Sequence, residues 1–173
     1  EHAALTEPLA VGVHAVEKGM LTGDESPLVV GCGPVGLAVI AALRLKNIRP
    51  IVAADFSPKR RELAVKMGAD IVIDPAQEDP YAKLAPGKRA AVFECVGVPG
   101  LIQQPMEKVP RGTRLVVVGV CMELDTIEPM FGIVKELNLQ FVLGYTPEEF
   151  ARSLHLLADG KVDAPSLITA KVG

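Results

Sequence analysis

The chain has 173 residues, of which 49% are apolar, and a formal net charge of −3, which suits one globular domain with a substantial core. Its 18 Lys and Arg residues are dispersed, and it has no Trp and only two Tyr, so it lacks the basic surface and the aromatic platform of a nucleic-acid-binding protein. Moderate charge and evenly spread apolar residues also exclude a disordered chain.

The first predicted element is a helix at Ala3–Lys18 with Pro8 in its first turn. An apolar stripe at helical spacing runs along it and would face a core. The stripe consists of Leu5, Leu9, Val13, Val16 and Met20.

From Leu28 onward, short apolar runs alternate with helical patterns. Six strands are predicted, at Leu28–Gly31, Ile51–Asp55, Ile71–Ile73, Ala90–Glu94, Arg114–Val118 and Leu139–Leu143. Four helices are predicted, at Val35–Lys46, Pro58–Met67, Gly100–Lys108 and Pro147–Ala158, and Ser166–Val172 is expected to be extended. Strands of continuous Val, Ile and Leu are typical of a parallel sheet covered on both faces. Because crossovers are right-handed, the pattern indicates an α/β fold with a doubly wound parallel sheet of about six strands and helices on both faces.

The uncharged run Leu28–Leu43 is 16 residues long and is interrupted by three glycines and a proline. It is too short for a membrane span, and a buried strand leading into a buried helix explains it better. Cys32, Cys95 and Cys121 form no CxxC pair and are interpreted as small buried side chains, which favours a reducing, cytoplasmic compartment. No signal peptide is visible.

A glycine-rich loop follows the first of these strands. Gly31, Gly33 and Gly36 have the G-x-G-x-x-G spacing, and Pro34 suits the first position of the following helix. In such a loop the first glycine permits a tight turn, the second lets the backbone approach a pyrophosphate, and the third lets helix and strand pack closely. The helix N-terminus then offers free N–H groups to phosphates. The alternative is a glycine-rich turn that binds nothing.

An acidic residue ends the second predicted strand. Asp55 follows Gly36 by 19 positions, close to the spacing at which a carboxylate accepts hydrogen bonds from the adenosine ribose of NAD. Its alternative role is a helix N-cap, which Ser57 before Pro58 could fill instead. Loop and carboxylate together predict a Rossmann-type, NAD-binding domain.

Several longer stretches resemble one family. ALTEPLAVGVHAVEKG, VVGCGPVGLAVI, VAADFSPKRRELAVKMGAD, VFECVGVPG and LVVVGV occur in that order and are similar to the zinc-dependent medium-chain alcohol and polyol dehydrogenases. The resemblance implies an oxidoreductase in which a zinc-bound alcohol gives hydride to the nicotinamide of NAD. It places Val35 near the nicotinamide and Arg60 at the adenosine end. It also implies that four residues line the cofactor groove or border the carboxamide, namely Val96, Gly97, Gly119 and Val120.

The same resemblance makes Glu7 a zinc ligand of the intact protein, in which the remaining ligands belong to a separate catalytic domain. Glu7 and His14 are seven residues apart, about 10.5 Å along a helix, which is too far for one zinc ion to bind both. We therefore expect this chain alone to hold neither zinc nor catalytic residues.

The domain organisation implied by the resemblance has three parts. Residues 1–22 would link from the catalytic domain, 23–158 would form the cofactor-binding domain, and 159–173 would begin the return to the catalytic domain. The chain begins without Met and stops within a pattern, so both ends are interpreted as cuts through a larger protein. The resemblance also implies homodimers that pair through the sheet edge at Leu139–Leu143, where an exposed apolar strand favours pairing.

Three other functions remain open. A zinc-free, NADPH-dependent reductase of the same superfamily is disfavoured by Asp55, although Lys59 and Arg60 could meet a 2′-phosphate. A methyltransferase also has a glycine loop and an acidic residue, but the EPLAVGVHAV and VFECVGVPG stretches are not expected there. A non-catalytic nucleotide sensor would need only the cofactor-binding domain.

Overall fold

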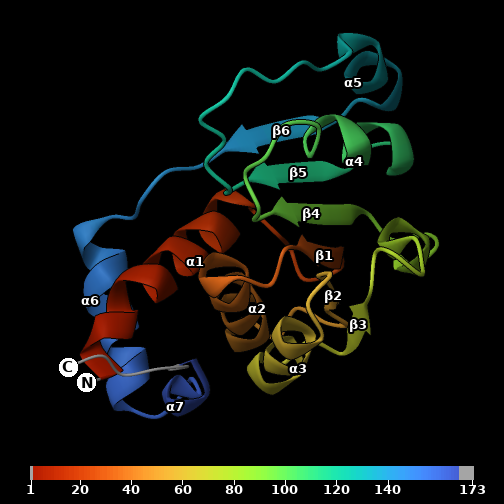
Figure 1. Ribbon diagram of the computed structural model, residues 1–173. Helices are drawn as coiled ribbons and strands as arrows, with labels where there is room; N and C mark the ends of the chain where they lie inside the picture. Colours follow the sequence, from red (N-terminus) through yellow and green to blue (C-terminus); the bar gives the residue numbers. More distant parts are fainter. Residues whose placement is uncertain (1, 168–173) are drawn as a thin grey trace.

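The computed structural model, which describes residues 2–167, contains one six-stranded sheet (Figure 1). The strands are β1 (Ser26–Val30), β2 (Val52–Ala54), β3 (Ile71–Ile73), β4 (Ala90–Glu94), β5 (Arg114–Val117) and β6 (Asn138–Phe141). Their order is β3-β2-β1-β4-β5-β6, and every neighbouring pair is parallel. This is the doubly wound order of a Rossmann fold, and it confirms the predicted fold class.

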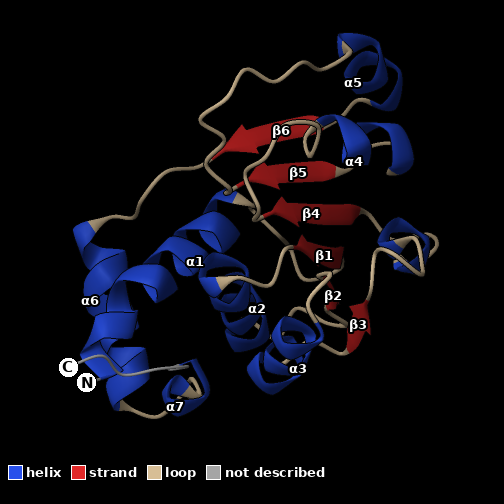
Figure 2. Cartoon of the chain, in the orientation of Figure 1, coloured by secondary structure: helices blue, strands red, loops and turns tan. Residues whose placement is uncertain are grey.

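Helices cover both faces of the sheet (Figure 2). They are η1 (His2–Leu5), α1 (Thr6–Lys18), α2 (Pro34–Leu45), α3 (Pro58–Met67), η2 (Pro80–Lys83), α4 (Gln103–Lys108), α5 (Pro129–Lys135), α6 (Pro147–Ala158) and α7 (Ala164–Leu167). Each helix predicted from the sequence is present, with its ends shifted by at most a few residues. The short elements η1, η2, α5 and α7 were not separately predicted.

Successive residues of the central strands point into two separate core layers. Val29 of β1 and its partner Phe93 of β4 pack with α1, α2, α3 and α6 on one face. Leu28 and its partner Val92 pack with η2, α4 and β5 residues on the other. All four side chains are fully buried, which explains why the strands show continuous apolar runs rather than alternation.

Helix α1 is part of the same core and contacts α2 closely. A Cβ atom at Gly12 would lie 2.5 Å from the main-chain carbon of Ala38, so the absence of a side chain lets the two helices approach. On its other side α1 meets α6, where His14 Nδ1 lies 2.8 Å from Glu149 Oε2. The prediction that Met20 belongs to the apolar stripe of this helix is wrong. Met20 lies beyond the end of α1, has a φ of 46° and is 65% exposed.

The strands β1, β2 and β5 differ from their predicted bounds by one or two residues, and two further differences lie toward the end of the chain. Strand β6 ends at Phe141 instead of Leu143, because its ladder with β5 stops at the Val117–Phe141 pair and Leu143 is left 84% exposed. The extended segment predicted at 166–172 is wrong for Ser166 and Leu167, which belong to α7, and its remainder lies outside the described residues. No helix in the described part of the chain is long and apolar enough to cross a membrane.

Candidate functional site

A cleft of about 820 Å³ lies at the carboxyl ends of the strands. Loops after β1, β2, β3 and β4 line it, so it opens where the strand order reverses between β1 and β4. Open α/β sheets bind ligands at this switch point. Five of the residues predicted from the sequence line the cleft, namely Gly31, Gly33, Asp55, Arg60 and Val96.

The three glycines of the loop have different surroundings. Gly31 has a φ of +90°, and a Cβ there would lie 3.3 Å from the Cys95 carbonyl. A Cβ at Gly36 would collide with the carbonyl oxygen of Gly31, so helix and strand pack closely there, as predicted. Gly33 has an ordinary φ of −71° and nothing within 4 Å of its Cβ position. Gly31 and Gly36 are therefore required by the close packing of the fold, whereas the missing side chain at Gly33 leaves open space at the cleft.

The N-terminus of α2 faces this open space. Gly33 is its N-cap and Pro34 its first residue, and no side chain caps it. The first N–H groups of this 12-residue helix are not capped by a side chain. Uncapped N–H groups at a helix N-terminus attract anions. Val35, in the same first turn, is half-buried against the core.

Asp55 links the glycine loop to the start of α3 through hydrogen bonds. Its carboxylate accepts hydrogen bonds from the backbone N–H groups of Cys32 and Ser57, both at 2.8 Å, and it is only 8% exposed. The N-cap of α3 is Ser57, whose Oγ accepts from Arg60 N at 3.4 Å, so the alternative role of Asp55 as N-cap is wrong. The exposed guanidinium of Arg60 lies 3.7 Å from Asp55 Oδ2.

The loops after β4 and β5 contact each other. A Cβ at Gly97 would lie 2.6 Å from Val120 N, and Gly119 abuts Gly97 in turn. The side chains of Val96 and Val120 are 46% and 62% exposed. The structure thus brings these four predicted residues together, although only Val96 among them lines the 820 Å³ cleft.

One wall of the cleft was not predicted from the sequence. Residues 75–81, which follow β3 and include the start of η2, line it, with Gln77 and Tyr81 among them. Asp79 Oδ1 accepts the Tyr81 N–H and Pro80 begins η2, so the Asp-Pro pair was the available signal for this turn. Arg61 was also missed, and it donates to the carbonyl oxygens of Asp55 and Phe56.

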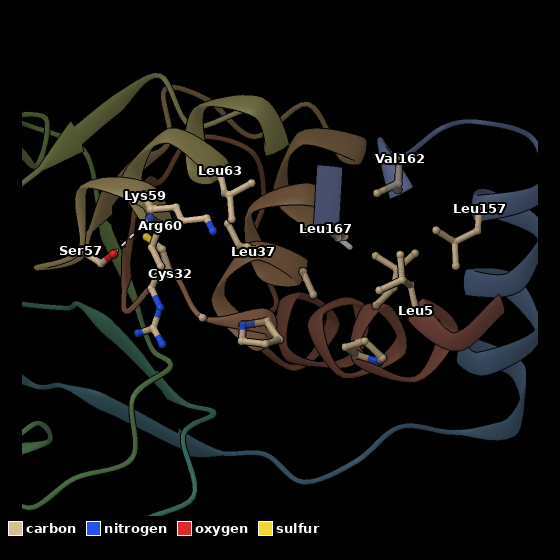
Figure 3. Close-up of a pocket in the computed structure, with 15 residues that line it drawn as sticks. Leu5, Cys32, Leu37, Ser57, Lys59, Arg60, Leu63, Leu157, Val162 and Leu167 are labelled. Carbon is tan, nitrogen blue, oxygen red and sulfur yellow. Dashed lines mark hydrogen bonds between the residues drawn. The ribbon is translucent and has the colours of Figure 1, made fainter. Parts of the chain in front are cut away.

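A second, mostly apolar cavity of about 340 Å³ lies beside the glycine loop (Figure 3). Helix residues Leu5, Leu37, Leu63 and Leu157 contribute to its walls, and it shares Gly33, Ser57 and Arg60 with the larger cleft. Lys59 lies at its α3 side.

Glu7 is exposed in the first turn of α1. Residues 2–167 contain no group of three His, Cys, Asp or Glu side chains arranged to hold a metal ion. His14 is engaged by Glu149 on α6 rather than facing Glu7. Of the zinc ligands that the resemblance implies for the intact protein, Glu7 is the one that lies among the described residues.

A Rossmann fold with an open glycine loop and an acidic residue after β2 defines a nucleotide-binding α/β domain of the dehydrogenase type. A family model described as zinc-binding dehydrogenase matches residues 34–159. The chain is 33% identical over 176 residues to (R,R)-butanediol dehydrogenase of Bacillus subtilis, covering 99% of this chain and 50% of that protein. It is 30% identical over 175 residues to human sorbitol dehydrogenase, covering 98% and 49%.

Solved structures of dehydrogenases have a similar fold over most of this chain. L-idonate 5-dehydrogenase from Escherichia coli superposes with a TM-score of 0.86 at 27% identity, covering 96% of this chain and 48% of that one. A zinc-binding dehydrogenase from Sinorhizobium meliloti, bound to NADP, gives 0.83 at 25% identity, covering 99% and 57%. The chain belongs to the zinc-dependent medium-chain alcohol and polyol dehydrogenase family, and it spans about half the length of the curated relatives it matches.

Proposed function

We propose that this chain binds NAD in the 820 Å³ cleft and serves as the cofactor-binding part of a dehydrogenase that oxidises an alcohol or polyol. The observation that carries the proposal is the open backbone at Gly33, which lies at the uncapped N-terminus of α2 and beside a nearly buried carboxylate that lines the same cleft.

The residues present fit a dinucleotide. The N–H groups at the start of α2 would hold the pyrophosphate, which can approach because Gly33 carries no side chain. Asp55 would accept hydrogen bonds from the adenosine ribose, and its two backbone donors hold its carboxylate in place for this. By the family resemblance, Val35 would lie near the nicotinamide and Gly119 and Val120 would border its carboxamide. The same resemblance implies that Val96 and Gly97 would line the cofactor groove. Bound NAD would supply the hydride acceptor.

Zinc fits this chain only in part. Glu7 is exposed at the surface and would contribute one carboxylate ligand, whereas catalytic zinc sites use three protein ligands. We therefore assign Glu7 to a zinc site completed by residues beyond those described, where the metal would lower the pKa of the alcohol. We expect the purified 173-residue chain to bind no stoichiometric zinc and to oxidise no alcohol.

NADP is the competing cofactor. Arg60 lies on the rim of the cleft, where it could pair with a 2′-phosphate, and one structural neighbour was solved with NADP. Against this, the 2′-phosphate carries about −1.5 to −2 charges, and Asp55 would repel it at close range. The ribose hydrogen bonds to that carboxylate would also be lost.

Calorimetric titration of the chain with NAD and with NADP tests the proposal. We expect NAD to bind at least about tenfold more tightly, which corresponds to about 1.4 kcal/mol. Equal or tighter binding of NADP would contradict the assignment of Asp55, and absence of binding by either dinucleotide would contradict the proposed function.

A further inference from the structure

Glu94, the last residue of β4, is a carboxylate buried to 2% exposure at the carboxyl edge of the sheet. Its Oε1 accepts hydrogen bonds from the N–H groups of Val96 at 2.7 Å and of Gly97 at 2.9 Å. Its main-chain oxygen accepts from Val118 N at 2.8 Å and from Gly119 N at 2.9 Å. One residue therefore holds both the loop after β4 and the loop after β5.

The backbones of the loops after β4 and β5 are in close contact. Gly97 has a φ of +76°, and a Cβ there would lie 2.6–2.8 Å from the main chain of Val120. A Cβ at Gly119 would lie 2.8 Å from Glu94 Oε2. Glu94 thus lies next to the contact between the backbones of the loops after β4 and β5. Val96 and Val120, the valines beside these glycines, have exposed side chains.

This buried carboxyl group is costly to the fold. Burial raises the pKa of Glu94, and the nearby carboxylate of Asp125 acts in the same direction, while the Gly97 and Val96 N–H groups lower it. Buried carboxyl groups persist where they satisfy donors that would otherwise be unpaired. Here those donors are the N–H groups of the loop after β4, so the interaction orders that loop.

We propose that Glu94 is a positioning residue for the nicotinamide half of the cofactor, because it holds the loops at residues 96–97 and 118–120 in the arrangement that presents Val96 and Val120. This rests on the proposed function, since it assumes that a dinucleotide occupies the cleft. The adenosine half depends on other contacts, namely the N-terminus of α2 and the carboxylate of Asp55 with its partners Cys32 and Ser57.

The test compares NAD with ADP-ribose, which has both riboses and the pyrophosphate but no nicotinamide. In the unaltered chain we expect NAD to bind more tightly than ADP-ribose. In Glu94→Ala we expect NAD affinity to fall about tenfold, as for the loss of two hydrogen bonds that fix its site, while ADP-ribose affinity changes less than about twofold. Glu94→Gln keeps an oxygen that can accept both N–H groups, so it should restore NAD affinity to within about threefold.

Two further measurements separate positioning from general destabilisation. Val92→Ala, two residues earlier on the same face of β4 and equally buried, should lower stability and leave both affinities unchanged. Amide hydrogen exchange should increase at residues 96–100 and 118–121 in Glu94→Ala but not at residues 31–36. If Glu94→Ala does not fold, Glu94→Asp, which retracts the carboxylate by one methylene, replaces it in the same titrations.

The outcomes distinguish this inference from the proposed function. If the unaltered chain binds neither ligand, the proposed function is contradicted. If it binds both and the Glu94 variant weakens both equally, or weakens neither, cofactor binding stands and the positioning role of Glu94 is overturned.

Discussion

At the scale of single residues, two buried carboxylates organise the carboxyl edge of the sheet. Asp55 holds the backbone of Cys32 and Ser57, and Glu94 holds that of Val96 and Gly97. Each lies directly after or at the end of a central strand, where the parallel ladder stops and leaves N–H groups to be satisfied. The same geometry that satisfies the backbone therefore fixes two residues that line the cleft, Ser57 and Val96.

The raised pKa of Glu94 predicts a pH dependence of stability. A carboxyl group whose pKa is higher in the folded state than its usual 4.5 stabilises the fold while it is protonated. That stability is lost as the pH rises through the folded-state pKa. We therefore expect the free energy of unfolding of the unaltered chain to fall relative to that of Glu94→Gln as the pH rises above about 4.5.

Urea unfolding of both proteins across this pH range measures the difference. The other ionisable groups whose electrostatic interactions involve Glu94, namely Asp125, Tyr81 and Cys95, are present in both proteins. Parallel stability curves for the two proteins would show that Glu94 titrates at its usual pKa.

At the scale of elements, the contact between α1 and α2 depends on a glycine. We expect Gly12→Ala to destabilise the fold by about 1–3 kcal/mol, because the new methyl group meets the main chain of Ala38 and Val39. The control is Gly132→Ala in α5, where the nearest atom is the flexible end of Met106 at 3.6 Å. That change should be neutral or stabilise by up to about 1 kcal/mol. Equal effects of the two substitutions in thermal or urea unfolding would contradict the close packing of α1 on α2.

The elements with strong sequence signals were predicted to within a few residues. Helices α3 and α6 begin at a proline preceded by a Ser or Thr N-cap, which marks their starts in the sequence. Helix α5 was missed because it is short and several of its apolar residues face solvent, including Met130, Ile133 and Val134. Strand β6 was placed too far along because Val142 and Leu143 continue its apolar run beyond the point where β5 ends.

The candidate site was likewise predicted only in part from the sequence. The spacing of Gly31, Gly33 and Gly36 and the position of Asp55 predicted the cleft, because each follows a strand at a fixed interval. The role of Glu94 could not be predicted, since it depends on the loop after β5, more than 20 residues later in the chain. The assignment of Val35, Val96, Gly97, Gly119 and Val120 to cofactor contacts remains a prediction.

At the scale of the whole molecule, the outer edge of the sheet is exposed. In the described part of the chain, β6 pairs only with β5, and Phe141 and Leu143 are 61% and 84% exposed. Helix α5, which lies beside this edge (Figure 1), exposes Ile133 as well. An unpaired apolar edge strand favours pairing with a second copy.

We therefore predict a homodimer that pairs through β6. Sedimentation of the unaltered chain should show dimers at high concentration, and Phe141→Lys should shift the equilibrium toward monomer. Val65→Lys, at a 52% exposed apolar position on α3, should leave the equilibrium unchanged. A chain that sediments only as monomer at high concentration would contradict the prediction.

The central claim is that a dinucleotide phosphate lies against the backbone at Gly33. Gly33→Ala tests it most directly, because the φ of −71° suits any residue and nothing lies within 4 Å of the new methyl group. The folded protein should keep its free energy of unfolding to within about 1 kcal/mol, since only the space open to ligand is filled. Calorimetric titration should then show that Gly33→Ala binds NAD at least about tenfold more weakly than the unaltered chain. Unchanged NAD affinity in a folded Gly33→Ala protein would contradict the account.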